Sequence, residues 1–519
     1  MSYPEHRKGC RREDHPDIGR RRLIEAGCLS LLGGTLADLL RAEAQANPEP
    51  RGPARRAKSV VFLFQSGGPS QFETWDPKPD APVDIRGEYG TTATKICGVR
   101  FCQYLPRLAA RADKFSIVRT MRHPAPPQLR NEHNSASYMI QTGKCELPPG
   151  ETTLTIPAPR SRRFEWPSIG STLAYALPHA AAFGLPPVVE IPRASIQQPG
   201  TGPGMLGTNY SRWRVDLAPP CHPPNGGGSC PNCFSYDQPN NPARAPGKGP
   251  QAWWDNSSCR DPQFRLPDLG VSSAMSLEML SNRAKLLAQI DRFRVGLDDE
   301  TSMRSMDAYR RQAWDLILGQ KGKNNPFDLT HEPRRIRELY GHEEWGQAFL
   351  VARRLVQAGV RMVQVNLRGW DTHENAFRDL KGHLLPSLDR CLSGFLDDLC
   401  SQGLLDETLI VMCGEMGRTP RVSAISGTDK NASGEPFTPG RHHWGDVFPC
   451  FFAGGGTRPG QVIGQTDKHG ALPVTDAYTP SDLAATIYHL LGVGPHQQFH
   501  DLEGRPHPIY LGHPIQALL

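Results

Sequence analysis

Short, continuously apolar stretches alternate along the chain with longer stretches of helical periodicity, and this alternation limits the folds open to it. Six of the short stretches are expected to be buried strands: Ser59–Gly68, Phe115–Met121, Pro186–Ile191, Arg361–Leu367, Thr408–Gly414 and Val447–Gly456. Helical periodicity dominates Ser276–Leu297, Met303–Leu318, Arg335–Ala358, the region around Leu380–Leu399, and Ser481–Gly492, with Ser481 as the expected N-cap. Strands that alternate with helices predict an α/β fold with a mostly parallel central sheet flanked by helices.

Polar clusters stand near the ends of these strands, where open α/β sheets bind their ligands. A single His or Glu in a loop is usually solvated or locally hydrogen-bonded, but successive clusters at strand exits point to a functional site. The segments are "QSGGPSQFETWDPKP" after the first strand, "NEHNSASYMIQTG" with His133 and Ser135 at an expected helix start, "GWDTHENAF" with Asp371 and His373, "GEMGRTP" with Glu415 and Arg418, and "GRHHWGDV" with His442 and His443.

Length and composition fit a large globular protein. The chain has 519 residues, of which 38% are apolar and 22% charged, enough for one large core or two domains. We recognise no repeat and no domain linker beyond residue 55, so residues 47–519 are expected to form a single domain. The net charge of +6 is mild, and no basic block is interleaved with aromatics. Nucleic-acid binding is therefore not predicted.

The N-terminus has the layout of a twin-arginine export signal. Arg20 and Arg21 precede a modest apolar stretch at Cys28–Leu40, and small residues lead up to Ala46. That stretch is too short and glycine-rich to make a good membrane span. We expect residues 1–46 to be removed, leaving a folded protein in the periplasm or outside the cell with no stable membrane span. An ordinary amphipathic first helix is the alternative.

A segment rich in Cys, Pro and Gly, at about 200–261, is expected to be a loop insertion. It contains Cys221, Cys230, Cys233 and Cys259, whose spacing differs from the usual zinc-finger patterns. In an oxidising compartment such residues form disulfides. We therefore favour two disulfides over a structural zinc or free thiols, and the pairing cannot be read from the sequence.

Several of these segments resemble those of a known superfamily. "LLDETLIVMCGEMGRTP", "HNSASYMIQTG" and "TPSDLAATIYHLLG" are similar to segments of the alkaline phosphatase and sulfatase superfamily. More closely, nearly all of residues 20–519 resembles an exported bacterial family called domain of unknown function 1501. The motifs shared with that family are "GGPSQFETWDPKP", "FLVARRLVQAGV", "GWDTHENAF", "GEMGRTP" and "GRHHW".

This resemblance implies an alkaline phosphatase/sulfatase-like fold with a metal site. Asp371 and His373 stand where the superfamily has an Asp/His ligand pair, and Glu415 takes the place of an Asp. His443 takes the place of the last His, with His442 as the second choice. Two carboxylates and two imidazoles suit one divalent ion, Zn²⁺ or Mn²⁺ before Ca²⁺ or Mg²⁺.

The resemblance also implies catalytic candidates. His133 falls at the nucleophile position and is a candidate fifth ligand, general base or nucleophile, while Ser135 is a weaker nucleophile candidate. Arg418 is a candidate clamp for an anionic oxygen. Trp370 and Trp444, each beside a candidate ligand, are expected either to wall the pocket or to pack in the core.

Three departures from the superfamily pattern matter. Gln65 and Ser66 stand where the first strand should end in an Asp, Met416 replaces the His that should follow Glu415, and the sulfatase C/S-x-P-x-R signature is absent. A formylglycine sulfatase and a two-metal phosphatase are therefore not expected.

Two functions are consistent with these observations. The first is an exported metal-dependent hydrolase acting on a phosphate or sulfate ester of a small molecule or polysaccharide. The second is a catalytically altered relative that binds an anionic ligand, such as a sulfated polysaccharide, without turnover. A purely structural role would leave the polar clusters at the strand exits unexplained.

Overall fold

The computed structural model of the chain describes residues 56–147, 164–177, 184–192, 199–217, 264–265, 325–423 and 438–519, with a few positions between 278 and 286. These residues belong to a compact unit that spans Pro53–Leu519. The expected export signal at residues 1–46, the four clustered cysteines, and all but a few positions of the helices expected at Ser276–Leu297 and Met303–Leu318 lie outside the described residues.

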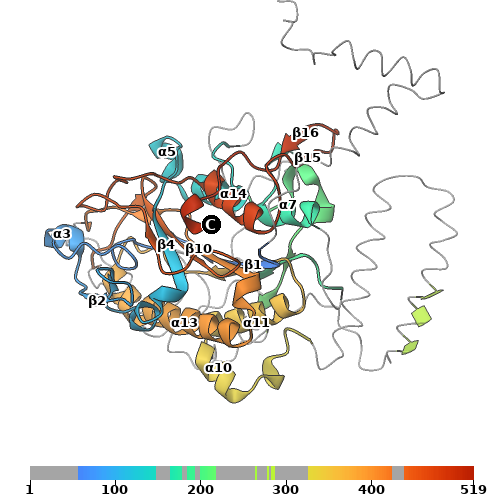
Figure 1. Cartoon of the computed structure of the whole chain (residues 1–519), viewed down its shortest axis with the longest axis horizontal. Helices are drawn as coiled ribbons and strands as arrows, with labels where there is room; N and C mark the ends of the chain where they lie inside the picture. The colour runs from blue at the N-terminus through green and yellow to red at the C-terminus, as the bar shows by residue number, and fades with distance from the viewer. Residues whose placement is uncertain are drawn as a thin grey trace, which may run out of the picture. The chain divides into compact units, whose positions relative to one another are not determined.

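A sheet forms the centre of this unit (Figure 1). It has eight strands, in the order β14-β4-β13-β10-β1-β9-β5-β6. Neighbouring strands are parallel except at β13, which is antiparallel to both β10 and β4. The bounds are β1 (Ser59–Gln65), β4 (Phe115–Met121), β5 (Val188–Ile191), β6 (Trp213–Arg214), β9 (Met362–Leu367), β10 (Thr408–Cys413), β13 (Phe448–Ala453) and β14 (Val462–Ile463). The mostly parallel sheet and all six expected strands are confirmed.

The sheet also contains two edge strands that the sequence did not predict. Both β6 and β14 are only two residues long, too short to show a periodicity. Because β6 pairs with β5, the first part of the segment at 200–261 extends the central sheet, where a loop insertion was expected.

Helices cover both faces of the sheet (Figure 1). One face packs against α4 (Pro106–Ala109), α10 (Arg334–Tyr340), α11 (Glu344–Gln357) and α13 (Leu385–Ser401). The other packs against α6 (His133–Thr142), α7 (Ile169–Ala176) and α14 (Pro480–Leu490). In β1, Val61 and Leu63 face the first layer, while Val60 and Phe62 face the second. Burial on both sides explains why the strand sequences are unbroken apolar runs.

Smaller elements connect this framework. The short helices are α3 (Val83–Arg86), α5 (Pro127–Arg130) and α12 (Ala376–Asp379), and a π-helical turn at Leu380–Leu384 joins α12 to α13. Four two-stranded ribbons are formed by β2 (Thr91–Ala93) with β3 (Arg100–Cys102), β7 (Asp216–Leu217) with β8 (Phe264–Arg265), β11 (Gly417–Arg418) with β12 (His443–Trp444), and β15 (Gln498–His500) with β16 (Pro506–Pro508). No helix among the described residues is both long and apolar enough to cross a membrane.

Two helix predictions need correction. The helix expected at Arg335–Ala358 is divided into α10 and α11 because Gly341, at φ +92°, ends the first of them. The N-cap of α14 is Thr479 rather than Ser481: Thr479 forms a capping box with Asp482, and the Ser481 hydroxyl donates to the carbonyl of Gly143. A proline at position 480 suits the first helical residue, which moves the cap one residue earlier than expected.

The loop after β1 approaches the loop after β9 so closely that only glycine fits. Gly67 has φ +113°, and a Cβ there would lie 2.2 Å from the backbone nitrogen of Asp371. The backbone of Asp371 can therefore lie at this position only because residue 67 is a glycine.

We predict that Gly67→Ala lowers the free energy of unfolding by about 3 kcal/mol or more, because it combines backbone strain with a collision between two backbones. Gly98→Ala is the matched control: Gly98 also has a positive φ, +76°, but nothing lies within 4 Å of the added Cβ. It should cost only roughly 1 kcal/mol. Urea unfolding measures both, and equal losses would contradict the close-approach argument.

Candidate metal centre

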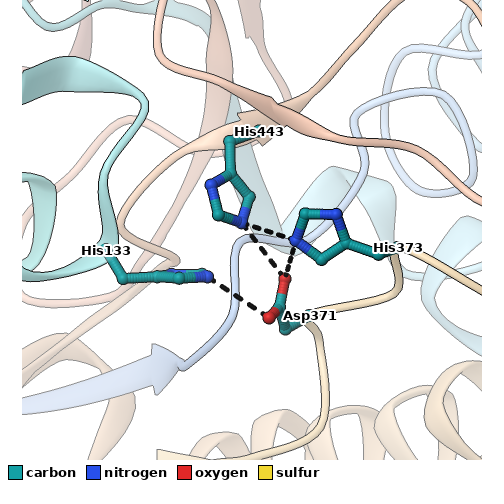
Figure 2. A group of neighbouring side chains, drawn as sticks. All are labelled: His133, Asp371, His373 and His443. Atoms are coloured by element: carbon teal, nitrogen blue, oxygen red, sulfur yellow. Dashed lines mark hydrogen bonds and ion pairs between the residues drawn. The ribbon is translucent and has the colours of Figure 1, made fainter. Parts of the chain in front are cut away.

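Four side chains from three parts of the chain meet beyond the carboxyl ends of β1, β9 and β10 (Figure 2). Asp371 and His373 lie in the loop after β9, His133 is the first residue of α6, and His443 lies in β12. One potential ligand atom from each lies within 4.8 Å of all the others. The group is half-buried, so it is both shielded and reachable from solvent.

Asp371 is the centre of this group (Figure 2). Its Oδ1 lies 2.9 Å from Nε2 of His373 and 3.3 Å from Nε2 of His443. Its Oδ2 lies 3.3 Å from Nε2 of His133. The two imidazole nitrogens of His373 and His443 are themselves 2.7 Å apart. All three rings thus present Nε2 to one carboxylate.

Neighbouring groups orient the rings so that Nε2 faces inward. Nδ1 of His443 lies 2.8 Å from the carbonyl oxygen of Asn131, which can only accept, so this nitrogen carries the proton in the neutral ring. Nδ1 of His133 similarly lies 2.7 Å from Oε1 of Glu415. When these rings are neutral, this arrangement leaves a free lone pair on Nε2, as metal-binding histidines require.

The charges of the group favour a cation at its centre. Burial alone raises the pKa of Asp371, but its bonds with the three imidazoles and the charge of Arg418 outweigh that and hold the pKa far below its usual range. Burial lowers the pKa of His133, yet its bonds to Asp371 and Glu415 raise it to about 10. Without a metal, this site therefore holds a proton that a metal ion can displace.

Glu415 lies behind His133 rather than in the four-residue group. Its carboxylate accepts from the backbone N–H of Gly67 at 2.9 and 3.1 Å and contacts Nδ1 of His133. The Glu415 carbonyl accepts from Nε2 of His123, a fully buried residue stacked on Phe448. The sequence analysis named Glu415 as a metal ligand. Its observed position suits a different task, which is to orient the ring of His133.

His123 itself was not singled out from the sequence. The signal was present, because His123 follows the predicted strand Phe115–Met121 by two residues and so also stands at a strand exit.

Arg418 is completely buried beside the group. Its guanidinium donates to the carbonyls of Gly67, Gly68, Trp370 and Arg441, and to Oδ1 of Asp371. These bonds occupy Nε and both terminal nitrogens. The structure thus places Arg418 as a support for Asp371, and its geometry does not suit the clamp on an anionic oxygen named from the sequence.

The other sequence candidates are engaged elsewhere. The hydroxyl of Ser135 donates to Glu132, the N-cap of α6, and Ser135 is fully buried. Trp370 is also fully buried and stacks on Trp345 with ring centroids 6.0 Å apart, which is core packing. Trp444 is half-buried and lines a pocket.

The donor set fits a divalent metal. Three imidazole nitrogens and one carboxylate are the ligands of Zn²⁺ and suit Mn²⁺. Nε2 of His133 is buried and faces Oδ2 of Asp371 at 3.3 Å, so both atoms point toward the place that an ion would take. His133, Asp371, His373 and His443 would hold the ion, with Glu415, Asn131 and Arg418 supporting them from behind.

Comparison with known proteins gives a family but no activity. A family model described as "Protein of unknown function (DUF1501)" matches residues 57–519. No curated protein matches the chain.

Solved structures similar to this chain include alkaline phosphatases and sulfatases. The alkaline phosphatase from the Antarctic bacterium TAB5 is 10% identical, with a TM-score of 0.31 over 84% of this chain and 99% of that chain. A sulfatase from Pseudoalteromonas sp. is 11% identical, with a TM-score of 0.34 over 88% and 70%. A phosphonate monoester hydrolase from Silicibacter pomeroyi is 13% identical, with a TM-score of 0.30 over 88% and 76%. Likeness at this level assigns neither an activity nor a ligand.

We predict that Arg418→Lys lowers the free energy of unfolding by about 3 kcal/mol or more, because one ammonium cannot replace a guanidinium that spans four buried carbonyls and the Asp371 carboxylate. Arg421→Lys, three residues away on a side chain that is 79% exposed, should change it by less than about 0.5 kcal/mol. Urea unfolding of both variants tests this, and a small loss in Arg418→Lys would show that the loops do not depend on the guanidinium.

We predict a loss of stability in mild acid that depends on His123. Burial lowers the pKa of His123 to about 4, below its ordinary value near 6.5. Between these values the unfolded chain binds a proton that the folded one does not, so stability falls as the pH drops. From pH 7 to 4.5 the wild type should lose about 2 kcal/mol more than His123→Gln. Urea unfolding at both pH values gives the comparison, and equal losses would contradict it.

Proposed function

This chain belongs to the family described as protein of unknown function DUF1501, and we propose that it is a metal-dependent hydrolase of phosphate or sulfate esters. The observation that carries the proposal is the convergence of His133, Asp371, His373 and His443 on one point at the carboxyl edge of the sheet. Four such ligands from three separate parts of the chain have no evident role in packing.

The chain's own residues would hold the reacting groups in place. Bound there, a divalent ion supplies Lewis-acid polarisation of a phosphoryl or sulfuryl oxygen. Asp371 balances part of its charge, and Arg418 keeps that carboxylate fixed and ionised. Glu415 and Asn131 keep the rings of His133 and His443 turned toward the centre. Fixed ligands need no rearrangement during the reaction, which is the main source of electrostatic catalysis.

His442 is an exposed neighbour of the site. It is exposed, and its Nδ1 lies 2.9 Å from Nδ1 of His373. Because this ring is exposed and contacts His373, it would touch the part of a substrate that stays outside the site.

A second function shares the same metal site. Gln65 stands where the superfamily has a carboxylate and is buried, and Met416 is packed fully in the core. Neither suits a hard divalent ion as a second metal ligand. These two positions favour a protein that holds one metal and binds an anionic ligand without turnover.

We also propose that the protein is exported by the twin-arginine route. Arg20, Arg21 and the short apolar stretch at Cys28–Leu40 support this proposal. Export to the periplasm or beyond would give the site access to polymeric esters outside the cell.

We predict about one equivalent of Zn or Mn per wild-type chain and its loss in His373→Ala. Mass spectrometry of the elements in purified protein measures this, beside His496→Ala, which removes an exposed histidine outside the site. Hydrolysis of p-nitrophenyl phosphate, p-nitrophenyl sulfate and esters of longer substrates should fall at least about 100-fold with the metal. If His373→Ala keeps its metal, the proposed metal site is wrong. If the wild type holds metal but hydrolyses none of these esters, the protein that binds an anionic ligand without turnover is favoured.

A further inference from the structure

We propose that a pocket beside the metal centre binds a saccharide ring, so that the substrate is an anionic oligosaccharide ester rather than a small ester. This inference rests on the proposed function for the ester group itself. The pocket, here called the ribbon pocket, has a volume of about 460 Å³, within the range of small-molecule sites. Its lining includes Pro82, Asp84, Pro420, Arg421, Trp444 and His469.

The ribbon pocket and the metal centre lie on opposite sides of one two-stranded ribbon. In the pairing of β11 with β12, Arg418 stands opposite His443, and Gly417 stands opposite Trp444. Because successive side chains of a strand point to opposite faces, Trp444 faces away from the side on which His443 meets Asp371. A ligand small enough to sit at the metal centre alone would therefore not touch Trp444.

His442 connects the two sides. Its side chain is exposed and contacts His373 of the metal centre. Its backbone pairs with Thr419, which lines the ribbon pocket: the Thr419 N–H donates to the His442 carbonyl at 2.9 Å, and the His442 N–H donates to the Thr419 hydroxyl at 3.0 Å. A ligand that fills both sites must pass over His442 and must be extended, as a chain of linked rings is.

The walls of the ribbon pocket match the two kinds of surface on a sugar ring. Trp444 offers an aromatic wall held in place by its Nε1–H, which donates to the carbonyl of Ala471 at 2.7 Å. Pro82 and Pro420 add apolar surface. A fixed aromatic ring flanked by apolar groups packs against the C–H face of a pyranose at little entropic cost.

Polar groups that would meet hydroxyls or anionic substituents stand at the rim. Arg421 and Asp84 are 3.7 Å apart and 79% and 47% exposed, a loose pair with donors and acceptors left for a ligand. His469 is a third polar group in the lining. A few polar groups around an apolar wall are the usual composition of a ligand site.

The pocket is held in shape without a ligand. The side-chain amide of Gln71 donates to the carbonyls of Arg418 and Gly470, which ties the ribbon to the loop that carries His469. The backbone N–H of Val422 donates to the carbonyl of Asp84 and holds the opposite wall. A preformed pocket loses less entropy on binding than one that must assemble.

Binding to an array of sulfated and phosphorylated oligosaccharides, with the matching monosaccharide esters, tests the proposal on the metal-loaded full-length protein. Hexasaccharides should bind at least about tenfold more tightly than the monosaccharide ester of the same kind, and Trp444→Ala should remove most of that difference. Trp444→Phe should retain more of it, and Arg421→Ala should weaken binding of charged oligosaccharides. Arg334→Ala removes a remote arginine that is 90% exposed and should change nothing.

The outcomes separate this inference from the proposed function. It is overturned if no oligosaccharide binds, if mono- and hexasaccharides bind equally, if Trp444→Ala binds like wild type, or if only aryl esters bind. The same array with His373→Ala removes the metal site but leaves the pocket, so a contribution from Trp444 should persist there. A wild type without metal would defeat the proposed function, whereas wild-type metal with no Trp444-dependent binding would defeat the pocket alone.

Discussion

The buried guanidinium of Arg418 is the interaction on which the rest of the site depends. It joins the loop after β1, through the carbonyls of Gly67 and Gly68, to the loop after β9, through Trp370 and Asp371. A guanidinium without solvent contact is costly unless nearly all of its N–H groups are satisfied and its charge is balanced. Because both conditions are met by residues from separate strands, the loops are held in one arrangement, and Asp371 is presented at a fixed point above the sheet.

The surrounding polar groups follow from that fixed carboxylate. Three imidazoles contact the Asp371 carboxylate. Groups behind two of these rings set which nitrogen faces inward: Glu415 behind His133, and the Asn131 carbonyl behind His443. The sheet contributes little chemistry of its own. Its contribution is to end three parallel strands at one edge, so that short loops from distant parts of the sequence are brought together.

Much of the fold was predictable because parallel strands buried on both faces require unbroken apolar runs. The direction of β13 was not, since an apolar run reads the same whichever way its strand points. The edge strands β6 and β14 were missed because a strand of two residues is too short to show a pattern of apolar and polar side chains. Strand exits also identified where to look for a site, and the structure brings Asp371, His373 and His443 together as expected.

Sequence could not separate a candidate ligand from the residue behind it. His133 and Glu415 lie in contact, and their order relative to Asp371 depends on how α6 and the loop after β10 pack, which no local pattern records. The same limit applied to Arg418, whose residue type suits both an anion clamp and a buried support. Only its complete burial and its carbonyl partners distinguish the two.

Anomalous diffraction from crystals of the protein, collected at the zinc and manganese absorption edges, would test the central claim most directly. The account predicts one peak, about 2.0–2.3 Å from Nε2 of His133, His373 and His443 and from an oxygen of Asp371, with Glu415 outside that distance. No peak at this position, or a peak held by other residues, would contradict it.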